Sequence, residues 1–218
     1  DAIQRQMVSD VPVCSFLSGG VDSSIVTAIA SNYLKERGMQ LNTFSFDFKD
    51  NSLYFQSNSF QPERDRPFVD IMLTKYNLNH TYLECDESLL VDLLYSAVDA
   101  KDLPGMADID SSLLYFCSLV RKHNKVALTG ECADEIFGGY PWFYRDELMW
   151  TNGLPWSKDI KTRTLLLNKD FVRELKLEEY VSDRYTQSLK SVPYLENENA
   201  AERRRREITY LNIKWFMQ

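Results

Sequence analysis

The sequence predicts an α/β fold: a parallel twisted sheet with helices on both faces, followed by a C-terminal helical annex. Three observations carry this prediction. Short apolar runs alternate with helical patterns through the first two thirds of the chain, as in parallel strands joined by right-handed crossovers. A glycine turn follows the first apolar run and opens the first long helical pattern. After Trp142 the strand-like runs thin out and helical patterns replace them. We therefore expect a sheet domain over residues 1–145 and a helical annex of it over 146–218.

Each element of this prediction has its own pattern. The predicted strands are 7–17, 41–48, 80–85 and 126–129, and the helices between them are 24–37, 68–76, 87–98 and 111–122. In the first helix Ile25, Ile29 and Tyr33 share one i, i+4 row, and Gly38 follows as a stop signal. Residues 49–66 are predicted to be a polar stretch. The annex is predicted to contain helices over 159–167, 170–175 and 200–216.

Composition excludes several classes of protein. The net charge of −7 argues against nucleic acid as the partner, because phosphate neutralisation needs a basic face. No apolar run approaches the ~18 residues of a membrane span, and no secretory signal is visible. The four cysteines form no C-x-x-C pair, so buried or half-buried free thiols in the cytoplasm are expected.

Three local patterns receive structural interpretations. The basic run Arg203–Arg206 is interpreted as a solvated helix face that pairs with Glu198, Glu202 and Glu207. The aromatic run 142–144 is interpreted as core packing against the annex. Cys132 is interpreted as a small residue in a tight turn rather than a catalytic thiol, because neither histidine shares a motif with it.

The segment L-S-G-G-V-D-S-S, residues 17–24, has the arrangement of an anion site. Two glycines allow φ > 0, so that successive N–H groups can face one phosphate, and the following helix start adds further donors. Ser18, Ser23 and Ser24 supply hydroxyls, and no lysine lies within the segment, unlike in a G-x-x-x-x-G-K-[ST] loop. Asp22 would repel a bare phosphate, so its presence indicates a divalent cation between carboxylate and phosphate.

This segment resembles the S-G-G-x-D-S-S signature of the PP-loop ATP pyrophosphatases. A second segment, T-G-E-C-A-D-E-I-F-G-G-Y at 129–140, looks like the S-G-E-G-x-D-E-x-F-G-G-Y block of asparagine synthetases. The chain thus resembles the C-terminal synthetase domain of glutamine-hydrolysing asparagine synthetase from about Met7 to Tyr144. The resemblance implies an adenine nucleotide alpha hydrolase-like fold with the fourth strand beside the first, and a site at the carboxyl ends of these two strands.

The resemblance also implies a reaction and roles for single residues. A substrate carboxylate attacks the α-phosphorus of ATP, pyrophosphate leaves, and ammonia from glutamine converts the acyl-AMP into an amide, as in asparagine biosynthesis. ATP and Mg²⁺ are the expected cofactors. Glu131 is the expected catalytic residue, accepting a proton from ammonia. Mg²⁺ is expected on Asp22 and Asp134. The residues expected to bind pyrophosphate are Ser18, Gly19, Gly20, Ser23 and Ser24, and those expected to line the nucleoside pocket are Leu17, Phe46, Thr129 and Gly130.

The chain departs from the family pattern at the amino-acid substrate. Where asparagine-forming members carry a T-T-I-R-A-S-like stretch, residues 104–112 lack the basic residue, and Asp108 and Asp110 stand there. This puts aspartate in doubt and suits a substrate with an amino group, such as diaminopimelate. A glutaminase domain is expected in the full-length protein, a homodimer is left open, and the chain alone is expected to be inactive because a phosphate-contacting lysine would lie beyond Gln218.

Two other functions remain open at this point. One is another PP-loop ligase, such as an NAD or GMP synthetase, against which the segment 129–140 argues. The other is a nucleotide-binding module without catalysis, against which the intact Asp22, Glu131 and Asp134 argue.

Overall fold

A computed structural model describes residues 1–58, 61–103, 105–157 and 160–217, without the side chain of Asp108. Contacts divide the chain into two compact units, Asp1–Gly130 and Glu131–Gln218. We describe each unit by itself. Across the described ranges, no helix is both long enough and apolar enough to cross a bilayer. The predicted division at residue 145 rests on sequence pattern and stays a prediction.

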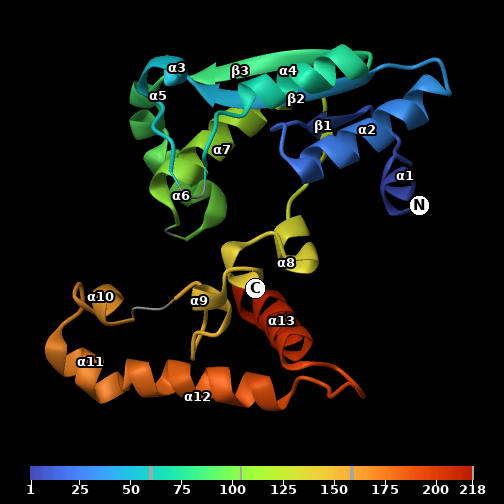
Figure 1. Cartoon of the computed structure of the whole chain (residues 1–218). Helices are drawn as coiled ribbons and strands as arrows, with labels where there is room; N and C mark the ends of the chain where they lie inside the picture. The colour runs from blue at the N-terminus through green and yellow to red at the C-terminus, as the bar shows by residue number, and fades with distance from the viewer. Residues whose placement is uncertain (59–60, 104, 158–159, 218) are drawn as a thin grey trace. The chain divides into compact units, whose positions relative to one another are not determined.

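The first unit is built on a four-stranded parallel sheet in the order β3-β2-β1-β4 (Figure 1). Its strands are β1 (Val13–Phe16), β2 (Leu41–Phe48), β3 (Leu78–Cys85) and β4 (Val126–Leu128). Strand β1 is central, with Ser15 in register with Thr43 of β2 and with Leu128 of β4. The predicted strand order is therefore confirmed, and strand order reverses between β1 and β4.

The helices of the first unit follow the predicted alternation with some differences. They are α1 (Ala2–Gln6), α2 (Val21–Lys35), α3 (Asn51–Tyr54), α4 (Arg66–Lys75), α5 (Glu87–Asp92), α6 (Leu94–Lys101) and α7 (Ala107–Val120). The first strand begins at Val13 and not near Met7, because α1 and the turn before Pro12, which has no N–H, occupy that stretch. The single helix predicted over 87–98 is two helices that meet at Leu93.

Helices cover both faces of the sheet, as predicted. On one face the Ser15 hydroxyl bonds the Thr27 hydroxyl of α2 at 2.9 Å, and both residues are fully buried. On the other face Phe16 packs on Phe116 of α7, with ring centroids 4.7 Å apart. Apolar clusters fill these layers. One contains Met7, Val13, Ala30 and Leu41, and the other contains Cys14, Phe44, Phe116 and Val120.

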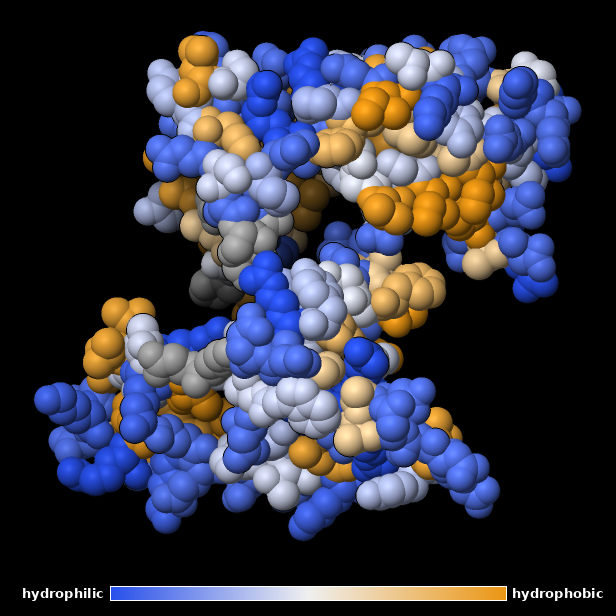
Figure 2. Space-filling view, viewed as in Figure 1, coloured by the Kyte–Doolittle hydropathy of each residue, from blue (hydrophilic) through white to orange (hydrophobic). Residues whose placement is uncertain are grey.

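The buried face of α2 is not the predicted apolar row. Its buried residues are Ser23, Thr27, Ala30 and Ser31. Ile25 is 50% exposed and Val21 73% exposed, and orange atoms gather over α2 in Figure 2. Small and hydroxyl side chains let the helix lie close to β1. The face of α2 that packs on the sheet is therefore the one with the smallest side chains and not the one with the most apolar area.

The second unit is helical. Its elements are α8 (Ala133–Phe137), η1 (Pro141–Phe143), α9 (Asp146–Met149), α10 (Ile160–Thr164), α11 (Lys169–Leu175), α12 (Leu177–Lys190), α13 (Ala200–Leu211) and the π-helix η2 (Asn212–Phe216). Trp142, Phe143, Met149 and Ile208 form its core, so core packing of the aromatic run is confirmed except at Tyr144, which is 59% exposed. A helix lies within each predicted range of the annex, although residue 159, at the start of the first range, lies outside the described residues. Helix α12 was not predicted.

The basic run on α13 is a correction to the sequence interpretation. Arg204 is buried, where its guanidinium donates to the carbonyls of Met149 and Thr151, both at 2.7 Å, and to the Tyr185 hydroxyl at 3.0 Å. The predicted pairing is present at Arg203, whose Nε lies 2.9 Å from Glu207 Oε1. The face is therefore packed, since this run holds α13 against neighbouring segments of the unit.

Candidate functional site

The predicted phosphate loop connects β1 to α2 through four residues, and Gly19 determines its shape. Gly19 has φ +82°, and a Cβ there would lie 2.6 Å from Phe68 Cβ and 2.9 Å from the Val69 nitrogen of α4. Only glycine fits such a position, both for its backbone angle and for its space. Gly20 has φ −63° and meets only the Ser18 hydroxyl, at 3.5 Å. The two glycines of the motif therefore differ, and the first carries the steric requirement.

Hydroxyl groups close the loop from inside. Ser23 Oγ donates to the Gly20 carbonyl at 3.1 Å and accepts from the Ser18 backbone N–H at 3.2 Å. The two hydroxyls of Ser18 and Ser23 also lie within bonding distance, 3.0 Å apart. No side chain caps α2 at Gly20, and Asp22 lies in its first turn. The first N–H groups of this 15-residue helix are therefore donors of the kind that binds an anion.

The second predicted segment begins beside this loop. A Cβ on Gly130 would lie 2.8 Å from the Ser23 nitrogen and 2.9 Å from Asp22 Cβ. Within the first unit the structure thus brings Thr129-Gly130, which follow β4, to the start of α2. A parallel sheet places both loops at the carboxyl ends of neighbouring strands, where ligands bind in such folds.

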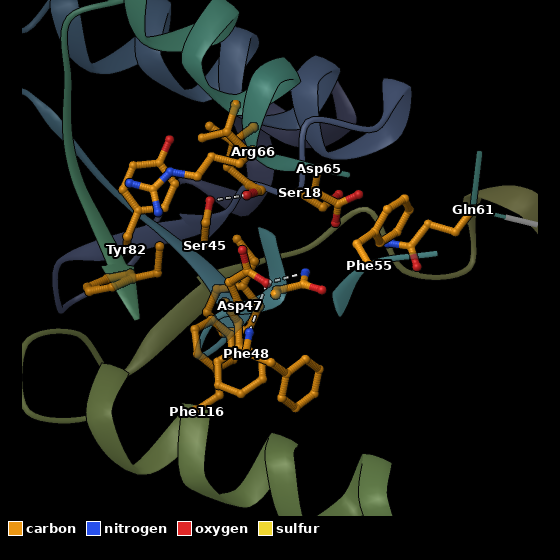
Figure 3. Close-up of a pocket in the computed structure, with 16 residues that line it drawn as sticks. Ser18, Ser45, Asp47, Phe48, Phe55, Gln61, Asp65, Arg66, Tyr82 and Phe116 are labelled. Atoms are coloured by element: carbon orange, nitrogen blue, oxygen red, sulfur yellow. Dashed lines mark hydrogen bonds between the residues drawn. The ribbon is translucent and has the colours of Figure 1, made fainter. Parts of the chain in front are cut away.

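A cavity of about 330 Å³ opens at the carboxyl end of β2 and reaches the phosphate loop (Figure 3). Its lining includes three predicted site residues, Leu17, Ser18 and Phe46. One part is aromatic, with Phe46 packed on Phe116 at 5.2 Å and on Phe48 at 5.5 Å. The other part is polar, and its lining residues include Ser18, Ser45, Asp47, Asn51, Gln61, Asp65 and Arg66.

The charged groups of this cavity perturb one another. Burial, followed by the charge of Asp47, raises the pKa of Asp65, and a hydrogen bond with Gln61 opposes this. Arg66 stacks on the Tyr82 ring, 3.9 Å from its centroid, and its guanidinium lies 3.7 Å from Glu84. Burial and the hydrogen bond that Tyr82 donates to Asp70 raise the Tyr82 pKa to about 12.

In the second unit, residues 131–140 contain the short helix α8 and the turns on either side of it, and several of these residues have constrained backbones. Cys132 has φ +68° and Gly138 φ +77°, and the Asp134 carbonyl accepts from the N–H groups of Gly138 and Gly139. A Cβ on Gly139 would lie 1.8 Å from Asp134 Oδ1, so the carboxylate requires a glycine there. The sequence F-G-G-Y thus supplies the space that the Asp134 side chain occupies.

Tyr140 bonds one acidic residue of this segment and feels the charge of two others. Its hydroxyl donates to Glu135 Oε1 at 2.9 Å, and Glu135 is buried. Burial, this hydrogen bond, and the charges of Glu135, Asp134 and Glu131 raise the pKa of Tyr140 above its ordinary value. The structure therefore brings the predicted residues Glu131 and Asp134 within electrostatic reach of the Tyr140 hydroxyl.

The described residues contain no group of three or more His, Cys, Asp or Glu side chains arranged to hold a metal. Asp22 is half-buried at the start of α2, in the first unit, and Asp134 belongs to the second. A carboxylate oxygen is a ligand that Mg²⁺ prefers, and Mg²⁺ commonly takes its remaining ligands from phosphates and water. Each carboxylate therefore fits the chemistry of a Mg²⁺–nucleotide complex.

Residues 104–112, where the family pattern has its substrate segment, contain one carboxylate that is neutralised by a lysine. Asp110 Oδ1 accepts from Lys101 Nζ at 2.6 Å, and its side chain is only 10% exposed. Gly105 lies against the same carboxylate. The charge of Asp110 is thus neutralised by Lys101 within the first unit. Pro104 and the side chain of Asp108 lie outside the described residues.

Sequence reasoning missed several residues of this cavity. Asp47, Gln61 and Asp65 line it, yet Asp47 was predicted only as part of the strand 41–48, and residues 49–66 only as a polar stretch. A usable signal was present in the aromatic residue Phe55, which interrupts that stretch and also lines the cavity. In the second unit, Glu135 and Tyr140 were part of the motif without an expected role. The four cysteines are free as predicted, but Cys117 is exposed.

Comparison with known proteins places these features in a family. The asparagine synthase family model matches residues 1–218. The chain is 46% identical over 218 residues to asparagine synthetase (glutamine-hydrolyzing) 3 of Bacillus subtilis (strain 168), a match that covers all of this chain and 35% of that protein. It is 35% identical over 149 residues to asparagine synthetase (glutamine-hydrolyzing) 1 of the same organism, covering 68% of the chain and 21% of the relative.

A third relative carries another name. Amidase chry2 of Gibberella zeae is 31% identical over 163 residues, a match that covers 68% of the chain and 22% of that protein. The chain spans about a third or less of the length of these relatives. Since the family model covers every residue, the chain belongs to the asparagine synthase family.

Proposed function

We propose that this chain is the ATP-dependent, amide-forming part of an asparagine synthetase-like ligase. One observation supports this most strongly: the loop of Gly19 and Gly20 opens α2, Gly130 lies against the same helix start, and the cavity begins at Ser18. In this proposal the loop and the α2 N–H groups hold the ATP phosphates that leave as pyrophosphate, through Ser18, Gly19, Gly20, Ser23 and Ser24. The nucleoside lies along Leu17, Phe46 and Thr129-Gly130.

The proposed reaction has two steps. A substrate carboxylate attacks the α-phosphorus of ATP, the bond to the β-phosphate oxygen breaks, and an acyl-AMP and pyrophosphate form. Ammonia then attacks the acyl carbon, AMP leaves, and an amide results. Positioning and charge stabilisation supply most of the rate in phosphoryl chemistry of this kind. A bound Mg²⁺ would offset negative charge on the phosphates, with Asp22 and Asp134 each proposed as a ligand.

Glu131 is the proposed catalytic residue, accepting a proton from the attacking ammonia. Its place in the turn with Asp134 and Glu135, near the Tyr140 hydroxyl, supports a constrained carboxylate. In the full-length enzyme, Glu131→Gln is expected to lower the rate of amide formation by ~10²–10⁴-fold with little change in the affinity for ATP. Glu174→Gln, an exposed change in the same unit, is the matched control. Equal rates for wild type and Glu131→Gln would remove Glu131 from the mechanism.

The substrate is proposed from the relatives. Two of them are named asparagine synthetases that hydrolyse glutamine, so aspartate and glutamine are the first pair to test, with the glutaminase activity supplied by a further domain. Diaminopimelate is the second candidate, because the segment 104–112 lacks a basic residue. The Lys101–Asp110 ion pair weakens the argument for an acidic pocket there. Cytoplasmic location, homodimer formation and the inactivity of the chain alone stay predictions.

Exchange of labelled pyrophosphate into ATP tests the first step. The full-length enzyme with Mg²⁺ and the correct amino acid is expected to catalyse this exchange, because forming the acyl-AMP is reversible. Asp22→Asn is expected to weaken binding of Mg²⁺–ATP in calorimetry, with the exposed Asp10→Asn as control. Binding of ATP without exchange, for any of the amino acids, would favour the alternative of a nucleotide-binding module without catalysis.

A further inference from the structure

The cavity beside the phosphate loop holds one carboxylate in a fixed position. Asp47 is the seventh residue of β2 and is half-buried. Its Oδ1 accepts from the Phe48 backbone N–H at 2.8 Å and from Asn51 Nδ2 at 2.7 Å. Only one of the two carboxylate oxygens takes part in these bonds. Asp47 is therefore oriented by the next residue of β2 and by the start of α3, and its second oxygen retains acceptor capacity.

The surroundings of Asp47 fit a flat aromatic ligand. Figure 3 shows Asp47 next to Phe48, with Phe116 on the same side, and Ser18 of the phosphate loop lines the same cavity. Phe48 and Phe116 belong to the aromatic part, and Phe55 stands on another side. Apolar rings with a few placed polar groups are the usual lining of a pocket that binds a small planar group.

Of the two carboxylates that line the cavity, Asp47 is the one on β2, the strand that also carries Phe46 and Phe48 of the aromatic part. The guanidinium of Arg66 is stacked on Tyr82 and paired with Glu84. Asp65 also lines the cavity, where its carboxyl is partly covered although the residue is exposed by surface area, and its hydrogen-bond partner is Gln61. Asp47 and Asp65 line the same cavity, so their negative charges lower its potential, and the charge of Asp47 also raises the pKa of Asp65. Such a space favours a ligand edge that donates hydrogen bonds and disfavours one that carries carbonyl lone pairs.

We propose that Asp47 selects the base of the nucleotide by accepting a hydrogen bond from the exocyclic amino group of adenine. The inference rests on the proposed function, because it takes the cavity as the nucleoside site. Adenine carries an amino group at its six position, whereas hypoxanthine carries a carbonyl there. A carbonyl would face the carboxylate lone pairs, and neither group could donate. Asp47 is thus assigned as a specificity residue, distinct from the loop that binds phosphate.

Calorimetry with ATP and inosine triphosphate, each with Mg²⁺, tests this assignment. The wild-type chain is expected to bind ATP at least ten times more tightly than inosine triphosphate. Asp47→Asn is expected to bring the two affinities within about threefold, since an amide can donate to a carbonyl as well as accept. Asp50→Asn removes the same charge from an exposed neighbour outside the cavity and is expected to leave the ratio unchanged.

The outcomes separate the two proposals. Equal wild-type affinities for the two nucleotides would overturn the role of Asp47 while leaving nucleotide binding intact. A preference for ATP that persists in folded Asp47→Asn would overturn it as well. Absence of binding to either nucleotide would overturn both the proposed function and this inference. The wild-type comparison needs no variant, and a thermal melt checks that Asp47→Asn, which keeps the Oδ1 acceptor, is folded.

Discussion

The two units of this chain are stabilised by different kinds of contact. The first unit packs helices on a parallel sheet through small buried residues and two apolar clusters. Among the residues of the second that the structure describes, there is one apolar cluster, and a buried arginine bonds its segments together. Tolerance to substitution should therefore differ. The stability of the first unit should be most sensitive to added side-chain volume where backbones approach closely. The stability of the second unit should be most sensitive to the loss of single polar groups.

The largest effect is expected at Arg204. Arg204→Met keeps much of the side-chain volume but leaves the carbonyls of Met149 and Thr151 and the Tyr185 hydroxyl without their donor. Removing one partner from such a buried network costs about 3–5 kcal/mol of unfolding free energy. Urea denaturation measures the loss, and hydrogen exchange should place it in the second unit.

Arg173→Met is the matched control for Arg204. Its guanidinium pairs with Asp170 on an exposed helix of the same unit, with 80% of the side chain accessible. Loss of an exposed pair is expected to cost at most about 1 kcal/mol. If both variants lose equal stability, buried polar bonds do not distinguish the second unit.

The next effect separates the two glycines of the phosphate loop. Gly19→Ala puts a Cβ against Phe68 and Val69 at a positive φ, and about 2–3 kcal/mol of destabilisation is expected together with at least tenfold weaker ATP binding. Gly20→Ala meets only a side-chain hydroxyl at 3.5 Å and should be close to wild type in stability. Chemical denaturation and calorimetry of both variants test the pair. Similar losses at both positions would show that the loop does not depend on this close approach.

A smaller, stabilising effect is expected at Cys132. Its φ of +68° is unfavourable for a side chain with a Cβ, and glycine adopts it freely. Cys132→Gly should raise the unfolding free energy of the second unit by about 1 kcal/mol or less, because the entropy cost of glycine offsets part of the relief. A thermal melt measures it, and a lowered midpoint would contradict the expectation.

The smallest effect concerns pH and His80. Burial lowers the His80 pKa below its ordinary 6.5, with Arg66 acting in the same direction and Asp70 opposing. The unfolded chain therefore binds more protons at this residue below about pH 6.5, so this contribution to stability is present above that pH and lost as pH falls through it. His80→Gln should flatten the pH dependence of the unfolding free energy over this range. His123→Gln is the control, and an unchanged profile in His80→Gln would exclude the contribution.

Sequence was a good guide where one local pattern determines an element. Strand 41–48 was predicted with its bounds, because apolar and polar residues alternate along it. The order of the strands, with the fourth beside the first, was implied by the family resemblance and not by a local pattern. The loop after β1 was predicted because its glycines have a local cause. That Gly19 rather than Gly20 carries the steric requirement was not predictable, since it depends on α4 approaching from fifty residues away.

The missed features have a common cause. Arg204 appeared as one of four consecutive arginines, and a charge run usually indicates a solvated face. Its spacing to Ile208 and Leu211, four and seven residues on, was the available signal of a buried position. Asp47 and Asp65 are brought to one cavity by β2 and α4, so their relation depends on tertiary structure that no local pattern contains.

The hydroxyl bond between Ser15 and Thr27 has a consequence for transplanting the phosphate loop. A helix can slide along a strand when only apolar contacts join them, but a buried bond of 2.9 Å fixes its position along that strand. One helical turn rises about 5.4 Å, so even a shift by one turn would break the bond. The four residues between Phe16 and Val21 thus span a set distance. A graft of this loop into another sheet should keep both hydroxyls, because their bond determines the distance that the four loop residues must span.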